Sequence, residues 1–268
     1  MFTIPTIHTK GFVYTVRPGN TLYSIAAQFG STVTAIERAN YLFPPVTDRG
    51  LIFPGDVLVV PTSAPSPLMS YIVTAGDTLT AIAQTFDTHV DLLAGINNIE
   101  NPGLIFVDQR LLVPAFSYKV VSGDTLYSIS RRFGISVSDI ETANAGRPGF
   151  QREVIWPDYH LIIPIPTSRN IFVTRPLPGT AINNGQLVEG YARVFEATVN
   201  YQLRDQNGVV VSNERFATAN AGAPAYGFFS TALPFDRQPT SDSGELWVYS
   251  RSAKDGSIQD LVRIRVYF

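Results

Sequence analysis

Three stretches of the chain repeat one pattern of apolar and polar positions. Each opens with a short β-prone run, "YTV", "YIV" or "YKV". In the first stretch a polar turn follows, and then Leu22, Ile25 and Phe29 fall at helical spacing. The pattern predicts a strand and then a helix with one buried face. The other stretches repeat that apolar face with Leu79, Ile82 and Phe86, and with Leu126, Ile129 and Phe133.

A second short helix and a closing strand complete each stretch. Thr34 with Glu37, and Ser138 with Glu141, have the spacing of a capping box. Asp91 can cap the second helix of the middle stretch but lacks the acidic partner. The runs "VLVVP", "RLLVP" and "HLIIP" predict the closing strands. Each unit therefore reads strand–helix–helix–strand, with its first and last strands paired antiparallel.

The three copies align in phase along the sequence. They begin at Tyr14, Tyr71 and Tyr118. Each then reaches an asparagine at one aligned position, Asn40, Asn97 and Asn144, which we expect to satisfy local backbone groups. All differences in length fall between this asparagine and the closing strand, so the flanking elements are expected to form a fixed core.

The turn into the first helix has its own recurring residues. A glycine stands where the turn needs a permissive backbone: Gly19, Gly76 and Gly123. An asparagine or aspartate and a threonine follow it and are predicted to supply the N-cap oxygens of the helix. These pairs are Asn20 and Thr21, Asp77 and Thr78, and Asp124 and Thr125.

The units resemble LysM modules, which bind peptidoglycan and chitin and have this topology. The resemblance rests on the "GNTL" and "GDTL" turns, on the asparagine after the second helix and on "LIFPGDVLVVP" at residues 51–61. It covers residues 14–164. The second copy departs from it, because Val107 and Asp108 replace the usual proline-glycine pair, and the third keeps Pro157 but has Asp158 for the glycine. These departures put the shape of the loop in doubt, and we expect unequal binding among the copies.

The remaining hundred or so residues have a different pattern. Seven short β-prone segments alternate with turn residues such as Asn207-Gly208 and Asp255-Gly256, as is typical of a sandwich. "EGYARVFEATVNYQL", "GFFSTALPF" and "KDGS" resemble the immunoglobulin-like domain of bacterial spore-germination proteins. The predicted fold is therefore multidomain, α+β and all-β, with three small βααβ LysM modules and a C-terminal seven-stranded immunoglobulin-like β-sandwich. The expected boundaries are an N-terminal arm at 1–13, module 1 at 14–61, a Pro/Ser-rich linker at 62–70, module 2 at 71–114, module 3 at 118–164 and the sandwich at 169–268.

Composition narrows the function. The net charge is −2 with scattered basic residues, so neither nucleic acid nor an anionic membrane is an expected partner. The absence of cysteine excludes disulfides, thiol catalysis and thiolate metal sites. Three histidines, His8, His89 and His160, have no ligand-like spacing, so no metal or other cofactor is expected, and His160 is interpreted as a surface residue. No secretory signal and no membrane-spanning run is visible in the sequence.

In the resembling family the sugar lies in a groove between the helix-entry turn and the loop before the last strand. This implies a glycan site in each copy, but several positions also have a structural interpretation. In that interpretation the Asn/Asp-Thr pairs merely cap the helix. The leucines are expected in the core, and so are Phe53 and Phe106, whereas Trp156 is left between core and sugar contact. The site residues are Gly19, Asn20, Thr21, Leu22, Ile52, Phe53 and Pro54 in copy 1, Gly76, Asp77, Thr78, Leu79, Ile105 and Phe106 in copy 2, and Gly123, Asp124, Thr125, Leu126, Ile155, Trp156 and Pro157 in copy 3.

The connections suggest how the copies are arranged. The linker "TSAPSPLMS" spans about 28 Å if extended, whereas "AFS" between copies 2 and 3 spans only about 10 Å. Copies 2 and 3 are therefore expected to pack as a nearly rigid pair. The longer loops "YLFPPVTDRG" and "AGRPGFQRE" of copies 1 and 3 are candidates to cover a groove.

Two functions remain open at this point. In the first, the chain is not an enzyme: it binds glycan containing N-acetylglucosamine, either peptidoglycan or chitin, and anchors the C-terminal domain in the cell wall or spore envelope, where that domain contacts coat or envelope proteins. In the second, it is a structural protein of the spore coat or surface whose modules pack against other proteins. A peptidoglycan hydrolase is a remote third, because "G-x-S-x-G" and "S-x-x-K" motifs are missing and the carboxylates Glu189, Glu196, Asp205 and Glu214 are scattered.

Overall fold

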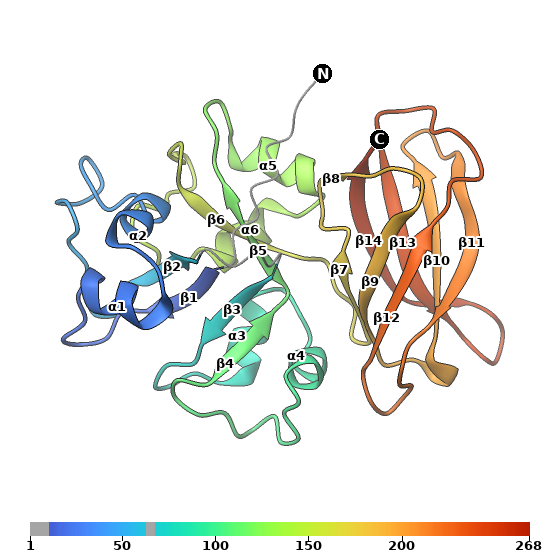
Figure 1. Ribbon diagram of the computed structural model, residues 1–268, viewed down its shortest axis with the longest axis horizontal. Coiled ribbons are helices and arrows are strands. Elements are labelled where there is room, and N and C mark those ends of the chain that lie inside the picture. The colour runs from blue at the N-terminus through green and yellow to red at the C-terminus, as the bar shows by residue number, and fades with distance from the viewer. Residues whose placement is uncertain (1–10, 63–67) are drawn as a thin grey trace.

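The computed structural model describes residues 11–62 and 68–268. Three small helix-containing modules form one part of the molecule, and a β-sandwich forms the other (Figure 1). The expected fold class is confirmed. Residues 1–10 and 63–67, which include most of the expected N-terminal arm and linker, lie outside the described residues.

Each module has the predicted order of strand, helix, helix and strand. Its first and last strands pair antiparallel, as in Tyr14 opposite Leu58 and Tyr118 opposite Leu161. Every first strand begins two or three residues before the recurring tyrosine. The elements are β1 Gly11–Thr15, α1 Leu22–Phe29, α2 Val33–Ala39 and β2 Val57–Pro61 in module 1, β3 Met69–Ile72, α3 Leu79–Thr85, α4 Val90–Ile96 and β4 Arg110–Val113 in module 2, and β5 Ala115–Lys119, α5 Leu126–Phe133, α6 Val137–Ala143 and β6 His160–Pro164 in module 3.

The helix caps differ in part from those predicted. The threonines cap the first helices, since their hydroxyls accept the N3 backbone N–H, but the preceding Asn20 and its counterparts do not. The second helices of modules 1 and 3 begin two residues earlier than the capping-box spacing implied, with Thr32 and Ser136 as caps. In module 2, His89 holds the cap position without a side-chain bond, and Asp91 points to the sandwich instead. Sequence spacing therefore found the helices but misplaced their first residues.

The recurring asparagine joins the second helix to the closing strand. In module 1, the Asn40 Nδ2 donates to the carbonyls of Ile36 and Val59, and its Oδ1 accepts the Val59 N–H. Asn97 makes the same three bonds to Leu93 and Leu112. Asn144 repeats them with Ile140 and Ile162. The prediction that these side chains satisfy local backbone groups is confirmed.

Modules 1 and 2 share one sheet. Its strand order is β2-β1-β3-β4, and β1 runs parallel to β3 with Val13 opposite Tyr71. Phe12 and Tyr14 face one side of this sheet and pack with the helices of module 1, together with Ile72 from module 2. Val13 and Val59 face the other side and pack with the helices of module 2. The linker therefore does not separate the first two modules, whose helices cover opposite faces of a common sheet.

Module 3 packs against module 1 through the longer loops. The Gly146 carbonyl accepts the Val57 N–H at 3.1 Å, and the buried Arg147 donates to Asn40 Oδ1 at 3.0 Å as well as to Asn144 Oδ1 at 2.6 Å. Gly149 lies so close to Val46 that a Cβ there would meet it at 2.8 Å. The loop of module 3 therefore joins the two modules and meets the loop of module 1 at Val46, a role that loop length alone did not predict.

The sandwich contains the seven predicted strands and one more. Its sheets have the orders β11-β10-β13-β14-β8 and β12-β9-β7. The additional strand, β8, has only two residues and pairs parallel with the end of β14, so no apolar alternation marks it in the sequence. The strands are β7 Ile171–Arg175, β8 Thr180–Ala181, β9 Gln186–Ala192, β10 Thr198–Asp205, β11 Val210–Thr218, β12 Gly227–Leu233, β13 Ser243–Arg251 and β14 Ile258–Tyr267, with a short 3-10 turn at Phe195–Ala197.

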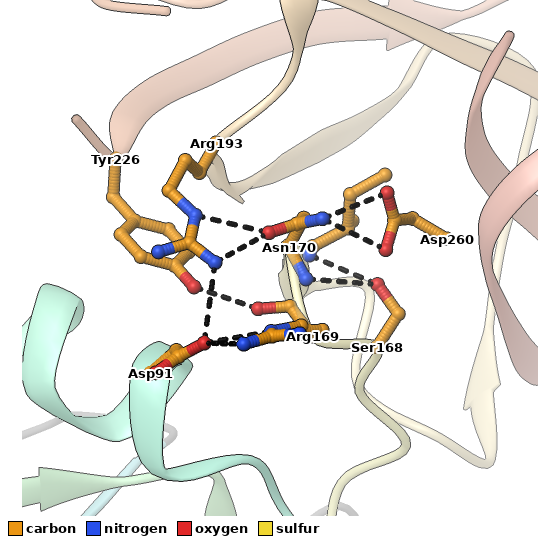
Figure 2. A network of polar contacts seen from close by, with 8 residues as sticks. Asp91, Ser168, Arg169, Asn170, Arg193, Tyr226 and Asp260 are labelled. Carbon is orange, nitrogen blue, oxygen red and sulfur yellow. Dashed lines mark hydrogen bonds and ion pairs between the residues drawn. The ribbon is translucent and has the colours of Figure 1, made fainter. Parts of the chain in front are cut away.

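The sandwich docks on modules 2 and 3. The core of module 3 is continuous with that of the sandwich, and the Tyr267 hydroxyl donates to the Arg132 carbonyl. Module 2 contributes Asp91, whose carboxylate binds the Arg169 guanidinium at 2.5 Å and the Arg193 guanidinium at 3.5 Å (Figure 2). These cations hold the pKa of Asp91 below its usual range.

The same network continues into the sandwich. Asn170 accepts from Arg193 at 2.8 Å and donates to both carboxylate oxygens of Asp260 (Figure 2). The Tyr226 hydroxyl donates to the Arg169 carbonyl at 2.6 Å, and its ring lies against Gly95 of α4. The joint between modules and sandwich is therefore built from charged and aromatic contacts that fix module 2 in place.

Candidate functional site

In each module the helix-entry turn and the loop before the closing strand meet at the end of the first strand. We call these two segments together the turn–loop face. In module 1, the Val16 N–H donates to the Asp56 carbonyl and the Gly55 N–H donates to the Val16 carbonyl. The faces comprise residues 17–23 and 51–56 in module 1, 74–80 and 104–109 in module 2, and 121–127 and 154–159 in module 3.

The asparagine or aspartate of the turn fixes the turn rather than the helix. Asn20 Oδ1 accepts the Tyr14 hydroxyl at 2.7 Å and the Arg17 N–H at 2.9 Å. Asp77 and Asp124 accept the equivalent tyrosine hydroxyls and backbone N–H groups. Burial and the neighbouring carboxylate raise the pKa of the tyrosine hydroxyls in modules 2 and 3. In module 3, Arg132 also donates to both members of that pair.

The altered loops keep the shape of the proline-glycine loop. Gly55 has a φ of 100°, and Asp108 and Asp158 take left-handed values of 68° and 70° at the same position. Their N–H groups donate to Val73 and Val120 as that of Gly55 does to Val16. Aspartate is among the residues that tolerate this conformation best. The substitutions therefore leave the backbone of the face unchanged.

The structure sorts the predicted site residues into three groups. Leu22, Leu79 and Leu126 are buried core residues, as expected, and the three threonines are exposed caps. The expectation that Phe53 and Phe106 lie in the core is wrong, because their side chains are 58% and 61% exposed. Gly19, Gly76 and Gly123 and Pro54 and Pro157 are exposed at the faces, whereas Asn20, Asp77, Asp124, Ile52, Ile105 and Ile155 are half-buried.

Trp156 differs from the phenylalanines at the aligned position. It is half-buried and stacks on Tyr41 of module 1, with ring centroids 4.9 Å apart and an angle of 20° between the planes. The turn–loop face of module 3 thus has its aromatic residue already engaged. This gives a structural reason to expect unequal glycan binding among the copies.

Sequence reasoning missed a second set of apolar residues on the faces. Tyr23 and Tyr127 follow the buried leucine of the first helix and point outward. They carry a signal that could have been used, since a tyrosine one position after a buried residue faces away from the apolar stripe of a helix. The further exposed members are Leu51, Leu104, Val107 and Val154.

The turn–loop faces also offer backbone donors. In modules 1 and 3 a capping box provides side-chain acceptors for the first and the last of the four initial N–H groups of the helix. The N–H groups of Leu22 and Tyr23 lie between these and have no carbonyl partner within the helix. A face therefore combines outward amide donors with exposed apolar side chains, an arrangement suited to a ligand that has both amide oxygens and apolar surfaces.

Metal ligands or a membrane-spanning helix would indicate other classes of site. Within residues 11–62 and 68–268, no group of three His, Asp or Glu side chains is placed to hold a metal ion. None of the helices described is long and apolar enough to cross a membrane. His160 is half-buried rather than on the surface, and its Nδ1 lies 3.1 Å from Ser117 Oγ. Burial, with Arg147 and Lys119 nearby, lowers its pKa to about 4.

Family comparison agrees with this geometry. The LysM domain model matches residues 14–61, 71–114 and 118–164, which together are more than half of the chain. The chain belongs to the LysM family. A second model, the immunoglobulin-like domain of bacterial spore germination, matches residues 170–257. Both resemblances seen in the sequence are confirmed, and three LysM modules of a peptidoglycan- and chitin-binding class precede the germination-type domain.

The curated relatives resemble the LysM part. The secreted LysM effector ECP6 of Passalora fulva is 35% identical over 128 residues, which is 40% of this chain and 54% of the relative. The N-acetylmuramoyl-L-alanine amidase sle1 of Staphylococcus epidermidis is 35% identical over 117 residues, 40% of this chain and 34% of the relative. The spore cortex-lytic enzyme SleL of Bacillus cereus matches with 35% identity and a TM-score of 0.30, over 38% of this chain and 22% of that one. This chain thus spans about half or less of the length of these proteins.

Proposed function

We propose that this protein binds glycans containing N-acetylglucosamine without cleaving them, and that it anchors its sandwich domain in a bacterial cell wall or spore envelope. LysM membership and the germination-type domain support an association with wall or spore. The glycan itself is peptidoglycan in the first instance, with chitin as the related alternative. The sandwich then presents a surface to other envelope or coat proteins.

One observation carries the proposal. Among the described residues of the modules, all the large hydrophobic side chains that are exposed belong to the turn–loop faces. Elsewhere on the modules such side chains are covered by the shared sheet, by the joined loops or by the sandwich. Exposed apolar side chains confined to one pair of segments in each module are typical of a binding surface. Modules that served only to pack against their neighbours would have no reason to leave these positions open.

The chemistry of a face suits an acetylated amino sugar. The N-acetyl group has a carbonyl that can accept from the outward N–H groups at the helix entry, and a methyl group that can lie on apolar side chains. Phe53 and Phe106 can stack on the flat apolar face of a sugar ring. In module 3 the aromatic contact falls to Tyr127, because Trp156 is stacked on Tyr41. We therefore expect module 3 to bind more weakly than modules 1 and 2.

Three of the four scattered carboxylates that could serve a glycosidase are engaged in other contacts. Glu214 binds the Arg251 guanidinium at 2.6 Å, and Glu189 lies 3.3 Å from Arg175. Asp205 accepts the backbone N–H groups of Asn207, Val209 and Thr240 and so holds two loops of the sandwich together. These contacts support a binding protein rather than a glycosidase.

The second candidate function, a structural protein of the spore coat, draws on a different observation. The three modules and the sandwich form one packed assembly, which would suit a building block of a coat. Asp108 and Asp158, however, preserve the shape of the loops, so these departures from the family pattern do not favour the structural function. The two functions differ in whether the intact chain is retained by glycan.

A pull-down of the full chain on insoluble peptidoglycan and on chitin tests the proposal. Retention is expected, and the triple variant Phe53→Ser, Phe106→Ser, Tyr127→Ser should pass through. Burying one phenylalanine contributes about 1.5–3 kcal/mol, so each single change should weaken binding at its site by about tenfold or more. Phe216→Ser is the matched control, since that side chain is 67% exposed on the sandwich. Free passage of the unmodified chain would favour the structural function.

Catalysis is tested with the same material. The protein is incubated with purified peptidoglycan, and the supernatant is analysed for soluble muropeptides. None should be released above the level seen with buffer alone. Release that grows with protein concentration would overturn the proposal that the chain only binds.

A further inference from the structure

Modules 1 and 2 are related by an approximate twofold rotation about an axis that runs along the strands between β1 and β3. The order β2-β1-β3-β4, with β1 and β3 parallel, requires this relation. The two sets of helices lie on opposite faces of the shared sheet, as the rotation demands. Tyr14 and Tyr71 are equivalent positions whose side chains point to opposite faces of the sheet. Residues that stand opposite each other in parallel strands point to the same face, so β1 and β3 are offset by one residue, with Val13 opposite Tyr71.

The rotation places both turn–loop faces at the same end of the sheet. Their loops before the closing strand make matching hydrogen bonds. Gly55 and Asp108 donate to Val16 and Val73 at 2.9 Å each. The N–H of Phe53 donates to the Asp56 carboxylate, and that of Phe106 donates to the Gln109 side-chain amide, at 2.8 and 2.9 Å. The faces are therefore two related sites with matching loops, each with its own exposed phenylalanine.

The boundary between the two sites is occupied by Arg17. Its guanidinium binds the Asp108 carboxylate at 2.8 Å and donates to the Val73 carbonyl at 3.2 Å. Arg17 belongs to the turn of module 1, whereas both partners belong to module 2. This ion pair thus holds the two sites in contact.

A glycan chain has a direction, because its two ends differ. A twofold rotation carries a straight, directed chain onto itself only when the chain lies along the axis, and both sites lie to the side of the axis. One straight chain therefore cannot follow both sites in the same binding mode. We propose that modules 1 and 2 bind two separate glycan chains, related by the twofold rotation, so that one protein molecule bridges neighbouring strands of the polymer. This inference rests on the proposed glycan binding and adds the number and arrangement of the chains.

Counting bound chains tests the inference. The full chain is titrated with the tetramer and the hexamer of β-linked N-acetylglucosamine, and native mass spectrometry gives the stoichiometry. Phe53→Ser and Phe106→Ser should each remove one bound chain, and the double variant should remove two. The dissociation constant at the remaining site should change by less than twofold, and the hexamer should bind no more than a few-fold tighter than the tetramer. Phe216→Ser should leave all values unchanged.

The alternative gives a different result. If one chain spans both sites, the hexamer gains from effective concentration and binds about 10²–10⁴-fold tighter than the tetramer. Either single variant then abolishes that gain without changing the number of bound chains, and only the double variant loses one. That outcome, or a Phe106→Ser variant that loses no chain, overturns the inference while glycan binding stands. A wild-type chain that binds neither oligomer overturns both.

Discussion

The side chain of the asparagine after the second helix takes the place of a neighbouring strand as hydrogen-bond partner of the closing strand. Its amide group occupies both hydrogen-bonding groups of one residue on the closing strand, and so holds the helix to the sheet at a point where no neighbouring strand is available. A buried amide in this role has no equivalent among the other side chains of similar size, since aspartate lacks the donor and leucine lacks both groups.

We expect Asn40→Ala to lower the free energy of unfolding by about 2–4 kcal/mol, because it leaves a buried N–H and C=O of Val59 without partners. Asn144→Ala should cost about as much, because Arg147 donates to both asparagines and loses an acceptor in either variant. Asn97 is half-buried, and its replacement by alanine should cost less. Urea unfolding checks this order. Equal losses at all three positions would show that burial of the amide does not determine its contribution.

His160 gives the molecule a dependence on pH. Its folded-state pKa of about 4 lies below the ordinary 6.5, so between these values the unfolded chain takes up a proton that the folded chain does not. Stability is therefore lost as pH falls from about 6.5 to about 4, by about 1–3 kcal/mol for this half-buried ring. His160→Gln should flatten the dependence of the thermal unfolding midpoint on pH across that window.

Among the elements, the first helix of each module shows which residues of the turn motif cap the helix and which do not. Glycine, then asparagine or aspartate, then threonine marks the turn in every copy, but only the threonine caps the helix. The sequence could not separate the two roles, because both side chains have oxygens suitable for a cap. The tyrosine that binds Asn20 lies six residues before it, beyond the range of local capping rules.

The caps make a prediction for these helices. Thr78→Ala should lower stability by about 1 kcal/mol, because the Ala81 N–H loses its acceptor. Thr80→Ala is the control, since Thr80 is exposed inside α3 and alanine there should be neutral or slightly favourable. Chemical denaturation of both variants measures the two changes in the free energy of unfolding. If the two changes cost the same amount, the cap contributes nothing.

The repeat pattern predicted each βααβ unit because its information is local: spacing of apolar residues, turn residues and the alternation of strands. The pairing of β1 with β3 was not predictable in this way. It depends on which exposed edges meet after the units form, and a proline-rich linker of that length permits several arrangements. Phe53 and Phe106 were assigned to the core for a related reason, since an aromatic side chain carries the same signal whether it is buried or left open for a ligand.

At the scale of the whole molecule, α4 and the sandwich fit together through a glycine. A Cβ on Gly95 would lie 2.0 Å from the Tyr226 ring, so the close approach requires that no side chain be present. Gly95 has an ordinary helical backbone, and alanine there would otherwise favour the helix. The glycine therefore serves the contact between domains at some cost to the helix.

Because of this contact, Gly95→Ala should have opposite effects on stability with and without the Tyr226 ring. Gly95→Ala should destabilise the wild-type chain by about 1–3 kcal/mol through overpacking. In a Tyr226→Ala background the same change should stabilise by about 0.5–1 kcal/mol, because the space is open and helix propensity dominates. Urea unfolding of the four proteins gives the coupling, and small-angle scattering reports whether the sandwich remains docked. The same sign in both backgrounds would show that the ring and the glycine do not meet.

The shared sheet also determines how this protein can be divided. If module 1 were deleted, β3 would become a bare edge strand with unpaired backbone groups, and the apolar residues Met69 and Val73 beneath it would lose part of their cover. Such an edge is a template for pairing with another chain. A shortened version beginning at module 2 would therefore tend to associate with itself, and its apparent avidity for a polymer would come from aggregation rather than from its own glycan site.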